Sequence, residues 1–148
     1  MPGDFAKLNL TITAGELNAA WQDRLDDAAV LEAGGRYGAA IAARLYALEI
    51  YLKFRICERL RVSNPLKKLE IHDLEALLLF SGLSAAMYGL PETSAVFQNW
   101  EEIRDFSGRL NDLRYFPAVK WNQRQSSDFA HWLEHPSEGV LSWLKTQA

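Results

Sequence analysis

RYGAAIAARLYALEIYLKFRICERLRV, residues 36–62, is the stretch of sequence that decides the fold. No proline interrupts it and no glycine follows Gly38, so it predicts one helix about 40 Å long at 1.5 Å per residue. At 100° per residue, its apolar side chains gather on two separate sides of that helix. One side carries Ile41, Leu45, Leu48, Leu52 and Ile56, and the other carries Ala39, Ala43, Tyr46, Ile50, Phe54 and Cys57. Because both sides must be covered, we expect this helix at the centre of a bundle or shared with a partner subunit.

Two polar strips separate the apolar sides. Glu49 and Lys53 form the first, an i, i+4 pair with the favourable order of charges. It serves as a surface pair, as a link to another helix, or as a contact with a nucleotide or a partner. The second strip consists of Arg44, Tyr51, Arg55 and Arg59. Its guanidinium groups either meet phosphate or neutralise the acidic first helix across a bundle interface.

Helix signals continue on both sides of this segment. Residues 1–12 alternate in polarity and predict a short extended arm. Thr13 and Glu16 have the spacing of a capping box, and the helix that they begin should end at Gly34-Gly35. Its buried face should contain Leu17, Trp21, Leu25 and Ala28.

The second half of the chain predicts shorter helices. A third helix opens near Ile71 and buries leucines up to Gly82, residues 84–91 are expected to be a loop, and a fourth helix covers about 92–107. Ser126 or Ser127 is expected to cap a helix through Glu134, and Pro136 and Ser137 to begin the last one. The predicted fold is an all-α, up-and-down bundle of four to five helices in a single domain, residues 13–148.

Composition excludes several classes of protein. The chain has 148 residues, 49% of them hydrophobic, and a net charge of −3, which excludes a disordered acidic protein. Its single cysteine excludes an internal disulfide and a cysteine-based zinc cage. We find neither a signal peptide nor an apolar run approaching the roughly 20 residues of a membrane span, so we expect a cytoplasmic protein.

Charge is distributed unevenly along the chain. Residues 1–35 carry a net charge of −4, residues 36–68 carry +6 and residues 69–148 carry −5. A weakly acidic protein therefore contains a basic central segment. Such a segment suits either an acidic neighbour within the bundle or a phosphate-bearing ligand.

Four short runs occur in an order that resembles HEPN (higher eukaryotes and prokaryotes nucleotide-binding) domains. They are AGGRYGAA at 33–40, ALEIYLK at 47–53, HDL at 72–74 and LRY at 113–115. The resemblance covers about residues 17–145. It implies a helical bundle, frequently a homodimer, linked to nucleotides or RNA cleavage. It also implies partnership with a minimal nucleotidyltransferase in toxin–antitoxin or defence modules.

The resemblance also suggests catalytic residues. Ribonucleases of the family carry an arginine and a histidine separated by four to six residues, need no metal, and bring two such pairs together in a dimer. Arg124 and His131 have six residues between them. The histidine would act as general base or acid on the ribose 2′-hydroxyl, and the arginine would stabilise charge on the phosphate. In the family a polar residue usually follows the arginine directly; here that position holds Gln125, a mild departure from the family's pattern.

Two further pairs are candidates for binding. His72 and Asp73 either bind a phosphate and transfer a proton or cap exposed amides at a helix start. Arg114 and Tyr115 either bind a ligand or anchor the segment to the bundle. We expect no metal site, because His131 and His135 lack a nearby third ligand in the sequence.

These observations favour a nucleotide- or RNA-linked binding or interaction protein, without a cofactor, that forms a homodimer and acts with a nucleotidyltransferase. A metal-independent ribonuclease that uses Arg124 and His131 is the alternative. A purely structural dimerisation domain is the third.

Overall fold

The computed structural model describes residues 12–67, 70–109 and 115–148, and within these ranges it is all-α, with no strand. It confirms the predicted class, a helical bundle, with four longer helices and several short ones. The helices are α2 (Ala14–Ala33), α3 (Tyr37–Leu60), α4 (Leu74–Phe80), α5 (Ser84–Tyr88), α6 (Ala95–Ser107), the 3₁₀ turn η2 (Ala118–Lys120), α8 (Gln123–Glu134) and α9 (Val140–Leu144).

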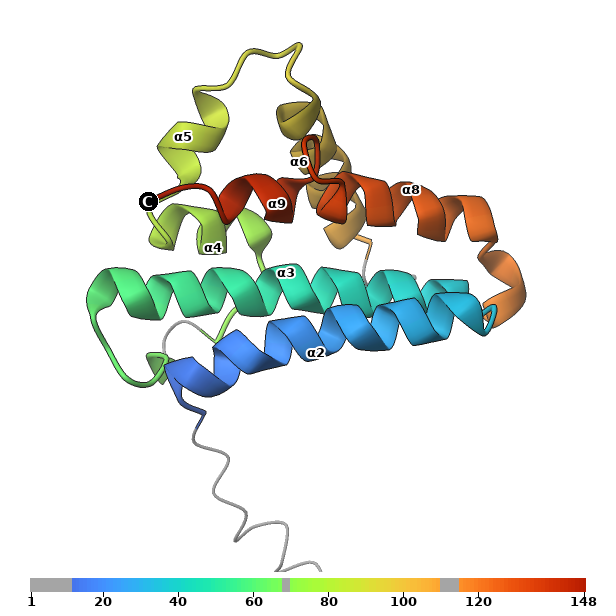
Figure 1. Cartoon of the computed structure of the whole chain (residues 1–148), viewed down its shortest axis with the longest axis horizontal. Coiled ribbons are helices and arrows are strands. Elements are labelled where there is room, and N and C mark those ends of the chain that lie inside the picture. The colour runs from blue at the N-terminus through green and yellow to red at the C-terminus, as the bar shows by residue number, and fades with distance from the viewer. Residues whose placement is uncertain (1–11, 68–69, 110–114) are drawn as a thin grey trace, which may run out of the picture.

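α2 and α3 form an antiparallel hairpin along the length of the molecule (Figure 1). The predicted capping box is present at the start of α2, where the Thr13 hydroxyl accepts from the Glu16 amide and the Glu16 carboxylate accepts from the Thr13 amide, both at 3.1 Å. The predicted stop is also present: Gly35 has a φ of 76°, a left-handed conformation that suits glycine. The predicted extended arm falls on residues 1–12, almost wholly outside the described residues.

α3 lies between α2 on one side and α8 and α4 on the other (Figure 1). The first predicted apolar side is fully inside: Ile41, Leu45, Leu48, Leu52 and Ile56 are all buried. The second side is covered unevenly. Ala43 and Cys57 are buried and Ile50 and Phe54 pack half-buried against the core, whereas Ala39 is exposed. The prediction of a central helix is confirmed. Ala39 is left uncovered within one chain, and the alternative that a partner subunit covers part of this side stays a prediction.

α8 and α9 follow each other along α3 in the direction of α3 itself, and α6 packs against both (Figure 1). Their buried side chains join one hydrophobic core with those of α3 and α4. The predicted inward residues of the fourth helix, Val96, Trp100 and Ile103, are all buried.

Three sequence predictions need correction in this half. Residues 84–91 are not all loop, because Ser84–Tyr88 form α5 around the buried Met87. α8 begins one turn earlier than expected, because Asn122 makes a capping box with Gln125, and Ser126 is buried inside the helix. The last helix begins at Val140 with Gly139 as its cap.

Close packing joins η2 to the start of α3. The Trp121 ring lies against Gly38, where a Cβ atom would stand 2.5 Å from Trp121 Cδ1, so only glycine fits there. Phe106 and Phe116 pack on the same indole with ring centroids 5.8 and 5.9 Å away. Across the described ranges, no helix combines the length and the apolar character needed to cross a membrane.

Candidate functional site

Arg44 of α3 is buried where α2, α3 and α8 meet, and its side chain links these helices. Its guanidinium pairs with Glu32 of α2 at 3.2 Å and with Glu134 of α8 at 2.7 Å, and it lies 3.4 Å from the Ser126 hydroxyl. Burial works to raise the pKa of Glu32, but the hydrogen bond from Ser126 and the charge of Arg44 outweigh it and hold that pKa below its ordinary value. Arg44 therefore follows the second of the two alternatives for the strip, in which the arginine neutralises the acidic first helix across a bundle interface.

Tyr51 and Arg55 continue the same strip toward the end of α9. Tyr51 is buried with its ring edge-on to Trp21, at a centroid distance of 5.3 Å. Arg55 donates to the Tyr51 hydroxyl at 3.0 Å and to the backbone carbonyls of Leu144 and Gln147 at 3.1 and 3.0 Å. Through these bonds Arg55 links α3 to the last residue of α9 and to the residues that follow it.

Arg59 is the most exposed arginine of the strip. Its Nη1 donates to the carbonyls of Leu79 and Phe80, and its side chain crosses over Gly82. Arg55 and Arg59 line a surface hollow of about 350 Å³ together with Glu58, Ser81, Gly82, Leu83 and Ala148. Two arginines of the predicted strip therefore meet at one concave site.

Glu49, Lys53 and His72 come together although they lie in different sequence motifs. The Glu49 carboxylate is buried, 3.0 Å from Nδ1 of His72 and 3.9 Å from Nζ of Lys53. Asp73 performs the capping role, accepting from the amides of Glu75 and Ala76 at the start of α4. The cluster thus links α3 to the segment that enters α4.

Arg124 and His131 share the outward face of α8. Seven residues are almost two turns, so the two side chains project in the same direction about 10 Å apart along the axis. The Arg124 side chain is 90% exposed and lies 4.0 Å from Asp128, and the His131 side chain is 46% exposed. Both groups are accessible to a ligand from solvent.

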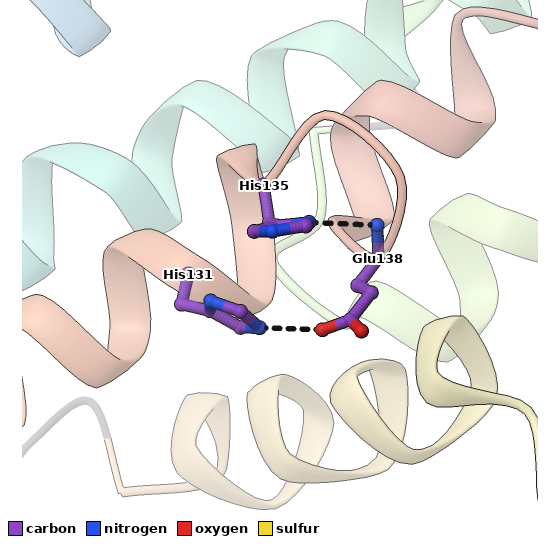
Figure 2. Close-up of side chains that lie close together, drawn as sticks. All are labelled: His131, His135 and Glu138. Atoms are coloured by element: carbon purple, nitrogen blue, oxygen red, sulfur yellow. Dashed lines mark hydrogen bonds and ion pairs between the residues drawn. The ribbon is translucent and has the colours of Figure 1, made fainter.

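Two histidines and a glutamate meet at the end of α8 (Figure 2). His131 Nε2 lies 2.8 Å from the Glu138 carboxylate, and the rings of His131 and His135 are stacked at a tilt with centroids 4.4 Å apart. One candidate ligand atom from each residue lies within 4.8 Å of the other two. Our sequence reasoning missed Glu138 as the third group, because only the turn after His135 brings it back toward α8.

The last predicted pair is only partly described. Arg114 lies outside the described residues, and Tyr115 is 80% exposed.

The sequence does not predict the contacts of three residues that hold these groups in place. Ser126 and Glu134 on α8 complete the Arg44 network, and Asn99 on α6 donates to the carbonyl of Glu138 at 2.9 Å. Only the inward position of Ser126 on its helix could have indicated that it contacts another helix. Nothing in the sequence predicts that Asn99 bonds to a turn 39 residues away.

Comparison of the chain with protein-family models, with curated proteins and with solved structures found no match. The resemblance to HEPN domains therefore stays a prediction from the four sequence runs.

Proposed function

We propose that this chain is a HEPN-like helical domain that binds the phosphate groups of RNA or of a nucleotide. In this proposal it acts as a homodimer with a nucleotidyltransferase partner, as one component of a toxin–antitoxin or defence-type module. The observation that carries the binding part is the hollow where Arg55 and Arg59 of the basic strip come together.

The chemistry of the hollow supports a phosphorylated ligand with hydroxyl groups. A guanidinium has five N–H donors, and the described bonds of Arg59 use only those of Nη1. Its Nε and Nη2 hydrogens remain for a phosphate, which arginine binds in a bidentate fashion. Glu58 on the wall supplies a carboxylate that accepts from a ribose hydroxyl.

Binding is measured by fluorescence anisotropy with a labelled RNA oligonucleotide, and by competition with ATP. Removing Arg59 with Arg59→Ala should weaken binding about tenfold, the value of one charge-assisted hydrogen bond, and should lower the salt dependence. Arg24→Ala is the matched control, because Arg24 pairs with Asp27 on α2 and does not line the hollow. Thermal melts check that both variants fold. Absence of binding by the unchanged protein, or equal loss in the two variants, would refute the proposal.

The dimer part is supported by the incompletely covered side of α3. Ala39 is exposed, and Ile50 and Phe54 are half-buried. Light scattering should give twice the mass of one chain. Ala39→Arg should shift the protein to monomers with an unchanged circular dichroism spectrum. If the unchanged protein is monomeric at all concentrations, the proposed homodimer is wrong.

A metal-independent ribonuclease is the second candidate, favoured by the exposed Arg124 and by the contact of His131 with Glu138. The carboxylate, 2.8 Å from Nε2, holds the imidazole in one orientation. The imidazole takes the proton of a 2′-hydroxyl while the 2′-oxygen bonds to phosphorus. The bond from phosphorus to the 5′-oxygen breaks, the 5′-oxygen takes a proton from an imidazolium or from water, and the products are a 2′,3′-cyclic phosphate and a free 5′-hydroxyl. The separation of about 10 Å favours an arginine and a histidine from different subunits at one phosphate.

Cleavage of RNA in the presence of EDTA tests this candidate. His131→Ala and Arg124→Ala should each abolish cleavage, while Arg24→Ala should retain it. Cleavage that survives in the His131 variant, or that is absent in the unchanged protein, rules the ribonuclease out.

A further inference from the structure

Three side chains at the end of α8 offer atoms that can bind a metal ion, and phosphate binding at the hollow does not use them. His131 and His135 stand four residues apart, the spacing that places two imidazoles on one side of a helix. Glu138 returns from the following turn with its carboxylate facing His131 (Figure 2). Within the described residues, these three side chains are close enough to share one ion, with ligand atoms no more than 4.8 Å apart.

The turn that supplies Glu138 is held from both sides. The amide of Gly139 donates to the carbonyl of His135 at 2.8 Å, and a Cβ at Gly139 would lie 2.6 Å from that carbonyl, so glycine is required. Asn99 of α6 donates to the backbone carbonyl of Glu138 at 2.9 Å. The backbone of the third ligand is thus fixed by a different helix before any ion binds, as in sites with ordered surroundings.

We infer that His131, His135 and Glu138 bind one divalent transition-metal ion, Zn²⁺ being the best fit. Two neutral imidazoles and one carboxylate supply three ligands and a single negative charge, and imidazole nitrogen suits zinc better than it suits magnesium or calcium. The 46% exposure of His131 leaves the fourth position of a tetrahedral ion open to water.

Binding requires only small rearrangements. In tetrahedral zinc sites with ligand bonds of about 2.0–2.1 Å, neighbouring ligand atoms stand about 3.3 Å apart. The longer separations in the cluster, up to 4.8 Å, must therefore shorten, while the 2.8 Å between His131 Nε2 and the Glu138 carboxylate must widen. The hydrogen bond between His131 and Glu138 is replaced by two bonds to the ion. Nδ1 of His135 accepts from the amides of Ser137 and Glu138 at 3.3 and 3.1 Å, and these long bonds are lost or exchanged as the ring becomes a ligand.

Titration of the full EDTA-treated chain with Zn²⁺ in a calorimeter tests the inference, with Co²⁺ absorption as a second readout of coordination. One ion per chain should bind. His135→Ala and Glu138→Gln should each weaken binding by more than tenfold, since even residues around a ligand change affinity by about 10- to 100-fold. His72→Ala is the control and should bind as the unchanged protein does.

His131→Ala is a further variant that should fold normally, because the His131 ring is exposed. Circular dichroism and thermal melts confirm the fold of each variant. No binding by the unchanged chain, an affinity in the His131 and His135 variants equal to that of the unchanged chain, or a loss confined to His72→Ala would overturn the inference. The titration contains no RNA, so its outcome is independent of the proposed binding and cleavage.

Discussion

Replacing Arg44 by methionine tests whether this buried arginine holds α2, α3 and α8 together. The change removes a side chain that is only 5% exposed and leaves the carboxylates of Glu32 and Glu134 without their cation. Removing one partner of a fully buried pair costs about 3–5 kcal/mol. Here the two carboxylates are 29% and 34% exposed, so water reaches them, and we expect a loss of about 2–3 kcal/mol in the free energy of unfolding.

Urea denaturation followed by far-UV circular dichroism measures this loss. At 1.4 kcal/mol per factor of ten, the ratio of folded to unfolded protein should fall roughly 30- to 150-fold. Arg24→Met is the control: its pair with Asp27 is exposed on α2, and removal of such a pair changes stability by about 0.5 kcal/mol or less.

A double-mutant cycle separates the ion pair from the packing of the arginine stem. Arg44→Met combined with Glu32→Gln should lose less than the sum of the single losses, with a coupling of about 1 kcal/mol or more. If Arg44→Met costs no more than Arg24→Met, or if the two changes simply add, the structural role that we assign to Arg44 is wrong.

Three other predictions follow from the described contacts. Gly38→Ala should destabilise the protein by about 1–3 kcal/mol and shift the fluorescence of Trp121, because the new methyl group collides with the indole. Gly15→Ala should stabilise it by up to about 1 kcal/mol, because the position is helical and the new methyl group makes only an ordinary contact, 3.9 Å from Thr13 Oγ1; urea titrations compare the two variants. The pKa of Glu32 is lowered in the folded state, so its contribution to stability is present above pH 4.5 and is lost as the pH falls through the folded pKa. As the pH is lowered from 6 to 3, the melting temperature should therefore fall less steeply in Glu32→Gln than in the unchanged protein. Burial raises the pKa of the Cys57 thiol, so an aromatic disulfide reagent should label it in urea and scarcely at all in the folded protein at pH 8; rapid labelling of the folded chain would contradict its 1% exposure.

Local signals explain why much of the fold was predictable. The Thr13–Glu16 box and Gly35 determine both ends of α2 through residues that are neighbours in sequence. The apolar pattern of 36–62 specified a buried helix because no competing residue interrupts it. α5 was missed because five residues carry too little periodicity to separate a helical turn from a loop.

The candidate sites were less predictable, since they depend on contacts between distant segments. Arg44 reads as a polar residue on a helix surface, and only the approach of Glu32 and Glu134 makes its burial possible. Glu138 follows a proline and a turn, so its return to His131 depends on the conformation of that turn.

The partners of α3 have a consequence for synthesis of the protein. Arg44 can pair with Glu134 only after 90 more residues have been synthesised. Arg55 can reach the carbonyl of Leu144 only after 89 more. At about 5–20 residues per second, a ribosome needs roughly 5–20 s to deliver them. During that interval α2 and α4 can pack on α3, while the part of α3 that α8 later covers stays exposed. That part is where a chaperone would bind the nascent chain.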